Sequence, residues 1–147
     1  MSSALPTSGI RLEIPARVDY VAVARLVVGA VASSDTDLSE ARLEDLKLAV
    51  TEACTNAVQA QASVTQEYRV VVDCAFTPDA IVVDVADQAG GFDPGDADDS
   101  VLIDDRKIAN EGGWGIPLIK TLSDEAEFMA KNSGTTVRLI FYRAHDT

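Results

Sequence analysis

A long amphipathic segment from Glu40 to Gln61 constrains the fold more than any other part of the sequence. Its apolar side chains recur at helical spacing and form one stripe: Leu43, Leu46, Val50, Ala53 and Ala57. At about 100° per residue, Glu52 and Asn56 lie about 40° apart on a different face of the same helix. The segment therefore predicts a helix that buries one side in a core and presents a carboxylate and an amide together on another.

The rest of the sequence alternates between strand and helix patterns. Strands are expected over 10–14, 68–74, 81–86, 125–131 and 135–142. Helices are expected over 18–32, over 40–61 and after a glycine turn at Gly112 to Gly115. The turn residues Thr77-Pro-Asp79 and Asn132-Ser-Gly134 predict that the strands on either side of each turn form an antiparallel hairpin.

Composition limits the number of domains and the class of partner. With 147 residues, of which 47% are hydrophobic, the chain has enough apolar material for one core. We therefore expect a flexible arm over 1–9 and a single domain over 10–147. The formal net charge of −12 would repel a nucleic-acid backbone or an anionic membrane surface, so it favours a partner with a basic surface.

Three observations favour a cytoplasmic protein with reduced thiols. Cys54 and Cys74 both lie within apolar segments and have no metal-binding spacing. Charged residues such as Arg11 interrupt the N-terminal region, so no signal peptide is expected. The longest apolar run, 21–32, is broken by Arg25 and is shorter than the ~20 residues that a membrane span requires.

Three short motifs contain residues suited to nucleotide chemistry. In Glu52-Ala-Cys-Thr-Asn56, the amide oxygen suits Mg2+ and the carboxylate suits a group that orients or deprotonates an attacking hydroxyl. In Asp87-Gln-Ala-Gly-Gly91, an acid follows an apolar strand, where an ionised carboxylate accepts hydrogen bonds such as those of the adenine amine. In Gly112-Gly-Trp-Gly115, backbone N–H groups at a helix start favour phosphate oxygens.

Each motif also has an ordinary structural explanation when it is taken alone: a solvated helix face, a turn or a packed loop. The glycines match neither a P-loop nor the dinucleotide-binding fingerprint. The irregular stretch over 93–111 is rich in aspartate, but its spacing does not fit a calcium-binding loop. A connection of this length is typical of a functional lid or of disorder. The order and spacing of the three motifs are more specific than any one of them.

In that order the motifs resemble those of the GHKL (Bergerat-fold) ATPases, and among these the anti-sigma-factor serine kinases of bacterial partner-switching systems. The resemblance covers roughly residues 10–142 and includes these further segments: Pro15 to Val21, Leu46 to Val58, Glu111 to Lys120 and Gly134 to Val137. It implies an α+β fold, a two-layer α/β sandwich in which helices cover one face of a mixed, mostly antiparallel sheet.

The resemblance also implies that the site binds ATP and Mg2+. Asn56 would be the magnesium ligand, and Glu52 would be the catalytic carboxylate that acts on the serine hydroxyl of a protein substrate. Asp87 would bind adenine, assisted by Gly91 and, through a water molecule, by Thr136.

The remaining implied contacts are to the phosphates. Three glycines would line the triphosphate with their backbone: Gly112, Gly113 and Gly115. Residues 93–111 would form an ATP lid, from which Arg106 or Lys107 would reach the terminal phosphate.

The implied function is that of an ATP-dependent protein-serine kinase and anti-sigma factor, which binds a sigma factor, phosphorylates a small antagonist protein and forms a homodimer. The alternative is a catalytically weak or inactive nucleotide-binding module that acts only by sequestration. Two departures bear on this choice: Ala89 stands where relatives usually have glycine, and Ala60 stands where many have histidine. A detached histidine-kinase domain is disfavoured, because the single histidine, His145, lies near the end of the sequence.

Overall fold

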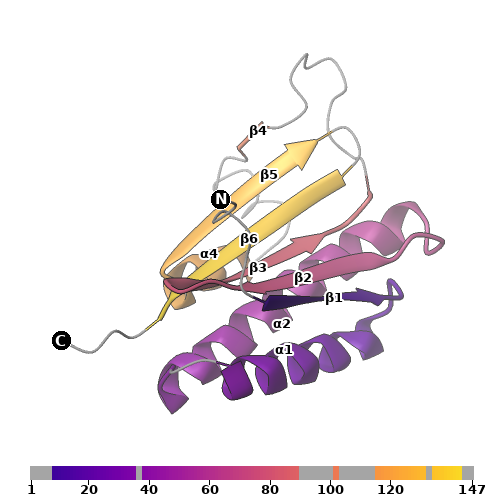
Figure 1. Ribbon diagram of the computed structural model, residues 1–147. Helices are drawn as coiled ribbons and strands as arrows, with labels where there is room; N and C mark the ends of the chain where they lie inside the picture. Colours follow the sequence, from indigo (N-terminus) through magenta and orange to yellow (C-terminus); the bar gives the residue numbers. More distant parts are fainter. Residues whose placement is uncertain (1–7, 36–37, 90–100, 103–114, 132–133, 144–147) are drawn as a thin grey trace, which may run out of the picture.

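The computed structural model describes residues 8–35, 38–89, 101–102, 115–131 and 134–143 (Figure 1). The elements in chain order are β1 (Ser8–Ile14), the 3-10 turn η1 (Val18–Tyr20), α1 (Val21–Asp35), α2 (Glu40–Val64), β2 (Val70–Phe76), β3 (Ala80–Ala86), β4 (Val101–Leu102), α4 (Gly115–Leu122), β5 (Glu125–Lys131) and β6 (Gly134–Tyr142). None of the helices in this described part is long and apolar enough to cross a membrane.

The strands form one sheet in the order β1-β2-β3-β6-β5-β4. Every strand pair that the structure describes is antiparallel, including the two hairpins that the turn residues predicted, β2–β3 and β5–β6. The helices α1, α2 and α4 lie against one face of this sheet (Figure 1). The architecture is therefore the two-layer α+β sandwich that the resemblance implied, although the described sheet is entirely antiparallel and not mixed.

The core lies between the helices and the sheet, because alternate residues of each strand point to the same face. Phe76, Ile81 and Phe141 are direct cross-strand partners on β2, β3 and β6, and all three are buried. The predicted stripe of α2 packs onto this face: Leu46, Val50, Ala53 and Ala57 are buried, and Leu43 is partly buried. Burial of one such large side chain contributes about 1.5–3 kcal/mol, so packing holds α2 in place.

The other face of the sheet carries paired charges. Arg11 lies directly opposite Asp73, and its Nε and Nη2 donate to the two carboxylate oxygens at 2.7 and 3.0 Å. Arg138 binds Asp84 in the same way, at 2.8 and 2.9 Å. Asp73 and Asp84 also face each other across β2 and β3, so the two arginines offset a repulsive pair. These side chains fix which face of each strand is turned away from the core.

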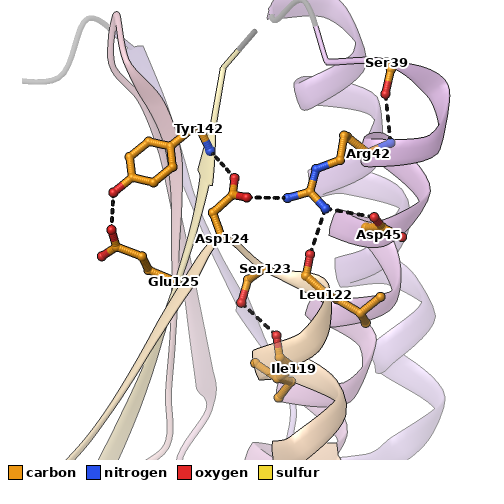
Figure 2. Close-up of polar contacts among 9 residues, drawn as sticks. All are labelled: Ser39, Arg42, Asp45, Ile119, Leu122, Ser123, Asp124, Glu125 and Tyr142. Atoms are coloured by element: carbon orange, nitrogen blue, oxygen red, sulfur yellow. Dashed lines mark hydrogen bonds and ion pairs between the residues drawn. The ribbon is translucent and has the colours of Figure 1, made fainter.

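Arg42 joins α2 to α4 and to the sheet (Figure 2). Its Nη1 donates to the Asp45 carboxylate and to the carbonyl oxygen of Leu122, the last residue of α4, both at 2.9 Å. Its Nη2 lies 3.1 Å from Asp124 Oδ1, and its guanidinium carbon lies 4.9 Å from the centroid of the Phe141 ring. The C-terminal end of α4 is therefore fixed against the first turns of α2.

Several element boundaries differ from those that periodicity predicted. β1 begins at Ser8, so its first residues lie within the expected arm. α2 continues to Val64, and β2 begins at Val70 instead of Tyr68. β4 lies within 93–111, a stretch expected to be irregular, and pairs with β5. Backbone hydrogen bonds set these ends, and side-chain periodicity does not record them.

Candidate functional site

Glu52 and Asn56 lie one turn apart on α2, and both side chains are partly buried. At about 100° per residue, Asp45, Glu52 and Asn56 point within about 40° of one another. The Arg42 guanidinium donates both to the Asp45 carboxylate and to the carbonyl oxygen of Leu122 at the end of α4. This side of α2 is therefore the side that faces α4. Within the described part of the chain, no hydrogen bond engages the side chain of Glu52 or Asn56. The described residues therefore leave both side chains available to a ligand.

α4 runs antiparallel to α2 and brings its N-terminus toward these two residues. Its last residue, Leu122, is held at Arg42 near the start of α2, and α4 packs along α2. At about 1.5 Å per residue, α4 is about 11 Å long, so its first residue, Gly115, lies about two turns farther along α2, in the direction of Glu52. The N–H groups at the start of α4, with the positive end of the helix dipole, therefore point toward the Glu52 side of α2.

Asp87 directly follows β3 and is nearly buried, with 8% of its surface exposed. Its Oδ1 accepts hydrogen bonds from the backbone N–H groups of Ala89 at 2.9 Å and Thr135 at 3.3 Å. Burial raises the pKa of the Asp87 carboxyl above its ordinary value, and these two donors oppose the rise. Oδ2 has no hydrogen-bond partner among the described residues, so it can accept one from a ligand.

The start of β6 presses against the turn that carries Asp87. Gly134 has a φ of +146°, and a Cβ atom there would lie 2.8 Å from the Asp87 carbonyl carbon and 2.9 Å from the Cα of Gln88. Glycine is required at this close approach, because it has no Cβ atom. The next residue, Thr135, accepts a hydrogen bond at its carbonyl oxygen from the Asp87 N–H at 2.9 Å.

The geometry favours Thr135 over Thr136 as the threonine beside the site. Thr136 lies opposite Ala86 in the β3–β6 register, so its side chain shares the charged face of the sheet, away from the helices. Asp87, one residue after Ala86, projects to the helix-covered face. The water-mediated contact expected of Thr136 is therefore better suited to Thr135. Because the two threonines are adjacent, the sequence alone does not indicate which of them points to the helix-covered face of the sheet.

Gln61 is a residue that the sequence reasoning missed. Its side chain is fully buried near the end of α2, and its Oε1 accepts a hydrogen bond from the Gln88 N–H at 2.6 Å. Its Nε2 donates to the Thr65 carbonyl oxygen at 3.1 Å. Gln61 therefore links α2 to the turn that carries Asp87. The available signal was an amide in line with the apolar stripe, four residues after Ala57.

Part of the expected phosphate site lies outside the described residues: Gly91, Arg106, Lys107, Gly112 and Gly113. These assignments, and the lid over 93–111, stay predictions. Among the residues that the structure does describe, no three His, Cys, Asp or Glu side chains gather into a metal site. A neutral amide such as Asn56 holds Mg2+ only together with phosphate oxygens and water, which is the usual arrangement for this ion.

Cys54 belongs to the same motif as Glu52 and Asn56 but serves the core. Its side chain is fully buried, and burial raises its pKa to about 12. The thiolate is the reactive form of cysteine, so this thiol is inert at neutral pH. The chemistry of the motif therefore rests on its carboxylate and its amide.

Comparison with known proteins places this arrangement in a family. Residues 14–141 match the histidine kinase-like ATPase domain, a span that contains α2, the Asp87 turn and the start of α4. The chain belongs to this family of ATP-using domains.

Within the family, the chain is similar over most of its length to the serine-protein kinases RsbW. It is 38% identical to RsbW of Bacillus velezensis over 140 residues, which are 90% of this chain and 84% of that relative. Identity to RsbW of Bacillus subtilis is 35% with the same coverage. For RsbW of Listeria monocytogenes it is 31% over 122 residues, 80% of this chain and 77% of that protein. The RsbW proteins are thus its relatives inside the ATPase family.

A solved structure supports the fold independently. The structure of the RsbU and RsbW domains of Rv1364c from Mycobacterium tuberculosis superposes with a TM-score of 0.69 and covers 97% of this chain. The match spans 34% of that longer chain, at 19% sequence identity. A likeness at this identity is evidence for the shared fold alone.

Proposed function

We propose that this chain is an ATP-dependent protein-serine kinase and anti-sigma factor, which binds a sigma factor and phosphorylates a serine of a small antagonist protein. The observation that carries the proposal is the nearly buried Asp87 carboxylate, whose Oδ2 has no hydrogen-bond partner among the described residues. The chain that holds it matches serine-protein kinases over 90% of its length. A buried acceptor at a strand end suits the exocyclic amine of adenine.

The described residues fit a bound Mg-ATP. Asp87 would accept the adenine amine at Oδ2, and Thr135 would stand beside it on β6. Asn56 would hold Mg2+ with its amide oxygen, together with phosphate oxygens and water. The N-terminus of α4 at Gly115 would face the phosphates, where the helix dipole favours negative charge.

The residues outside the described ranges would complete the phosphate site. Two further glycines and one lid cation would contact the triphosphate: Gly112, Gly113 and either Arg106 or Lys107. Gly91 would line the adenine side. The lid over 93–111 would cover the bound nucleotide.

Glu52 would act on the substrate. Bound ATP supplies the phosphoryl group, which the substrate serine oxygen takes as the bond to the bridging oxygen of ADP breaks. Glu52 would orient the serine hydroxyl and receive its proton. It lies one turn from Asn56 on the same side of α2, so an acid and a metal ligand would reach the same phosphate.

We also propose that two copies of the chain form a homodimer through α1 and β1. β1 is an edge strand of the described sheet. Beside it, Val18, Val23 and Leu26 expose 60%, 40% and 64% of their surfaces. Exposed apolar side chains beside a free strand edge are typical of a surface that another chain covers.

A transfer assay tests the kinase activity. The purified chain, incubated with radiolabelled ATP, Mg2+ and its cognate antagonist, should label the antagonist. Glu52→Gln should slow transfer by about 100-fold or more, because a positioned acid–base group contributes that much, and should retain ATP binding by calorimetry. Glu44→Gln, an exposed glutamate of the same helix, is the matched control and should leave the rate unchanged. Partner binding without any transfer by the wild-type chain would establish the sequestration-only module instead.

A further inference from the structure

Gln61 makes a hydrogen bond that its place in the helix does not require. A buried side-chain amide costs free energy unless both ends are hydrogen-bonded, and here Nε2 donates to Thr65 while Oε1 accepts from Gln88. The end of α2 is already closed by the backbone bond from the Thr65 N–H to the Gln61 carbonyl at 2.9 Å. An apolar side chain could fill this core position, but it could not bind the Gln88 N–H.

The Gln88 N–H needs this acceptor because sheet pairing ends just before it. The last bond of the β3–β6 ladder joins the Asp87 N–H to Thr135 at 2.9 Å. Gln88 is the next residue, and the 2.6 Å bond to Gln61 satisfies its N–H. Gln61 thus holds the peptide between Asp87 and Gln88 from the side of α2.

The same turn sets the direction of the Asp87 carboxylate. Ala89 donates to Oδ1 two residues along, which closes an Asx-turn on its own side chain. From the side of β6, the close approach of Gly134 limits movement of the Asp87 and Gln88 backbone. The orientation of the carboxylate therefore depends on a turn held between β6 and the Gln61 side chain.

We propose that Gln61 is a positioning residue for base recognition, which holds the Gln88 peptide so that Oδ2 of Asp87 meets the exocyclic amine of adenine. The inference rests on the proposed ATP site. Gln61 acts through Asp87 and touches no nucleotide. Its loss should therefore weaken binding of ATP more than binding of inosine triphosphate, in which a carbonyl oxygen replaces the amine.

Titration calorimetry with Mg-ATP and Mg-inosine triphosphate tests this role. Gln61→Met keeps the length of the side chain and removes both amide hydrogen bonds. It should weaken ATP binding about tenfold, the size of one hydrogen bond to a charged group, with inosine triphosphate affected less than about twofold. Gln61→Glu keeps an acceptor for Gln88 and should retain more of the ATP preference. Gln59→Met, an exposed glutamine of the same helix, is the matched control and should match the wild-type chain.

Asp87→Asn separates failure of this role from failure of the site. A wild-type chain without any preference for ATP would overturn the adenine contact and the role of Gln61 together. A wild-type preference that Asp87→Asn abolishes and Gln61→Met leaves intact would refute Gln61 alone. Combining Gln61→Met with Asp87→Asn should cost no further preference.

An equal loss of affinity for ATP and for inosine triphosphate in Gln61→Met would mean that Gln61 supports only the fold. Melting temperatures without nucleotide are measured for each variant, so that titrations run well below unfolding. If the methionine variant does not fold, Gln61→Asn provides the same test, because its side chain is one methylene shorter and remains polar. It should lose the ATP preference, and a retained preference would refute the proposal.

Discussion

At the scale of single residues, the site depends on an acid kept where the fold does not favour it. Asp87 is nearly buried, and burial raises the pKa of its carboxyl above the ordinary value of 3.8. Two backbone N–H donors, from Ala89 and Thr135, offset part of this cost. A buried acid that costs stability, and whose second oxygen is unpaired among the described residues, is typical of a binding site, where local rules of stability are broken for function.

Asp87→Asn should therefore weaken ATP binding until its preference over inosine triphosphate is lost, and should make the free protein more stable than the wild type at neutral pH. The asparagine carbonyl oxygen still accepts the hydrogen bonds of both backbone N–H groups. Its amide NH2 group is a donor, so it cannot accept a hydrogen bond from the adenine amine. A raised pKa means that the folded state binds the proton more tightly than the unfolded state. The cost of the ionised carboxyl is therefore complete above the raised pKa and is relieved as pH falls toward 3.8.

Thermal unfolding without nucleotide, followed from neutral to acidic pH, checks this expectation. The melting temperature of Asp87→Asn should exceed that of the wild type most at neutral pH, and the two should converge in acid. Asp79→Asn, in the exposed β2–β3 turn, is the matched control. A lower melting temperature for Asp87→Asn at neutral pH would show that the charge of Asp87 stabilises the fold.

At the scale of elements, side-chain periodicity predicted what side chains determine and missed what the backbone determines. The i, i+4 spacing of Glu52 and Asn56 predicted their shared side of α2, because helix geometry alone sets it. The choice between Thr135 and Thr136 depends on the register of β6 against β3, which hydrogen bonds set. The place of Gln61 in line with the apolar stripe could indicate burial of its amide, but not its role, since its partner Gln88 is distant in sequence.

The position of α4 also depends on contacts between residues that are distant in sequence. Arg42 spans from the first turns of α2 to the end of α4 and to Asp124, the residue before β5 (Figure 2). Nothing in the spacing of the motifs indicates that this arginine aligns α4 with α2. The first residue of α4, Gly115, can face the Glu52 side of α2 only if that alignment is kept.

Arg42→Ala should lower the free energy of unfolding by about 2–3 kcal/mol, because it removes a partly buried cation and its charge-assisted hydrogen bonds to Asp45 and Leu122. The free energy of unfolding of Arg42→Lys should lie between those of Arg42→Ala and the wild type. A lysine keeps the charge, but its ammonium group cannot bind several acceptors at once as the planar guanidinium does. Urea denaturation measures the loss, and hydrogen exchange should show faster exchange in α4. Arg17→Ala breaks an exposed pair with Asp19 and should cost at most about 1 kcal/mol. Equal losses for the two alanine variants would contradict the role of Arg42.

At the scale of the whole molecule, charge and apolar surface act in opposite directions on assembly. The net charge of −12 makes two copies of the chain repel each other, yet it attracts a partner with a basic surface. The exposed apolar residues of η1 and α1, among them Val23 and Leu26, favour association whatever the charge of the partner. Ionic strength should therefore separate the two kinds of complex.

The dissociation constant of the proposed homodimer should fall as salt rises, because salt screens the repulsion over a Debye length of about 10 Å at 0.1 M. Binding to a basic partner should weaken over the same range. Leu26→Gln should weaken the dimer by about tenfold or more, since a symmetric interface loses the buried leucine twice. Tyr142→Ser, which removes an exposed side chain from β6, is the matched control. Sedimentation equilibrium at two salt concentrations measures all three chains. A wild-type chain that stays monomeric at high salt, or a dimer that Leu26→Gln leaves unchanged, would rule out assembly through α1.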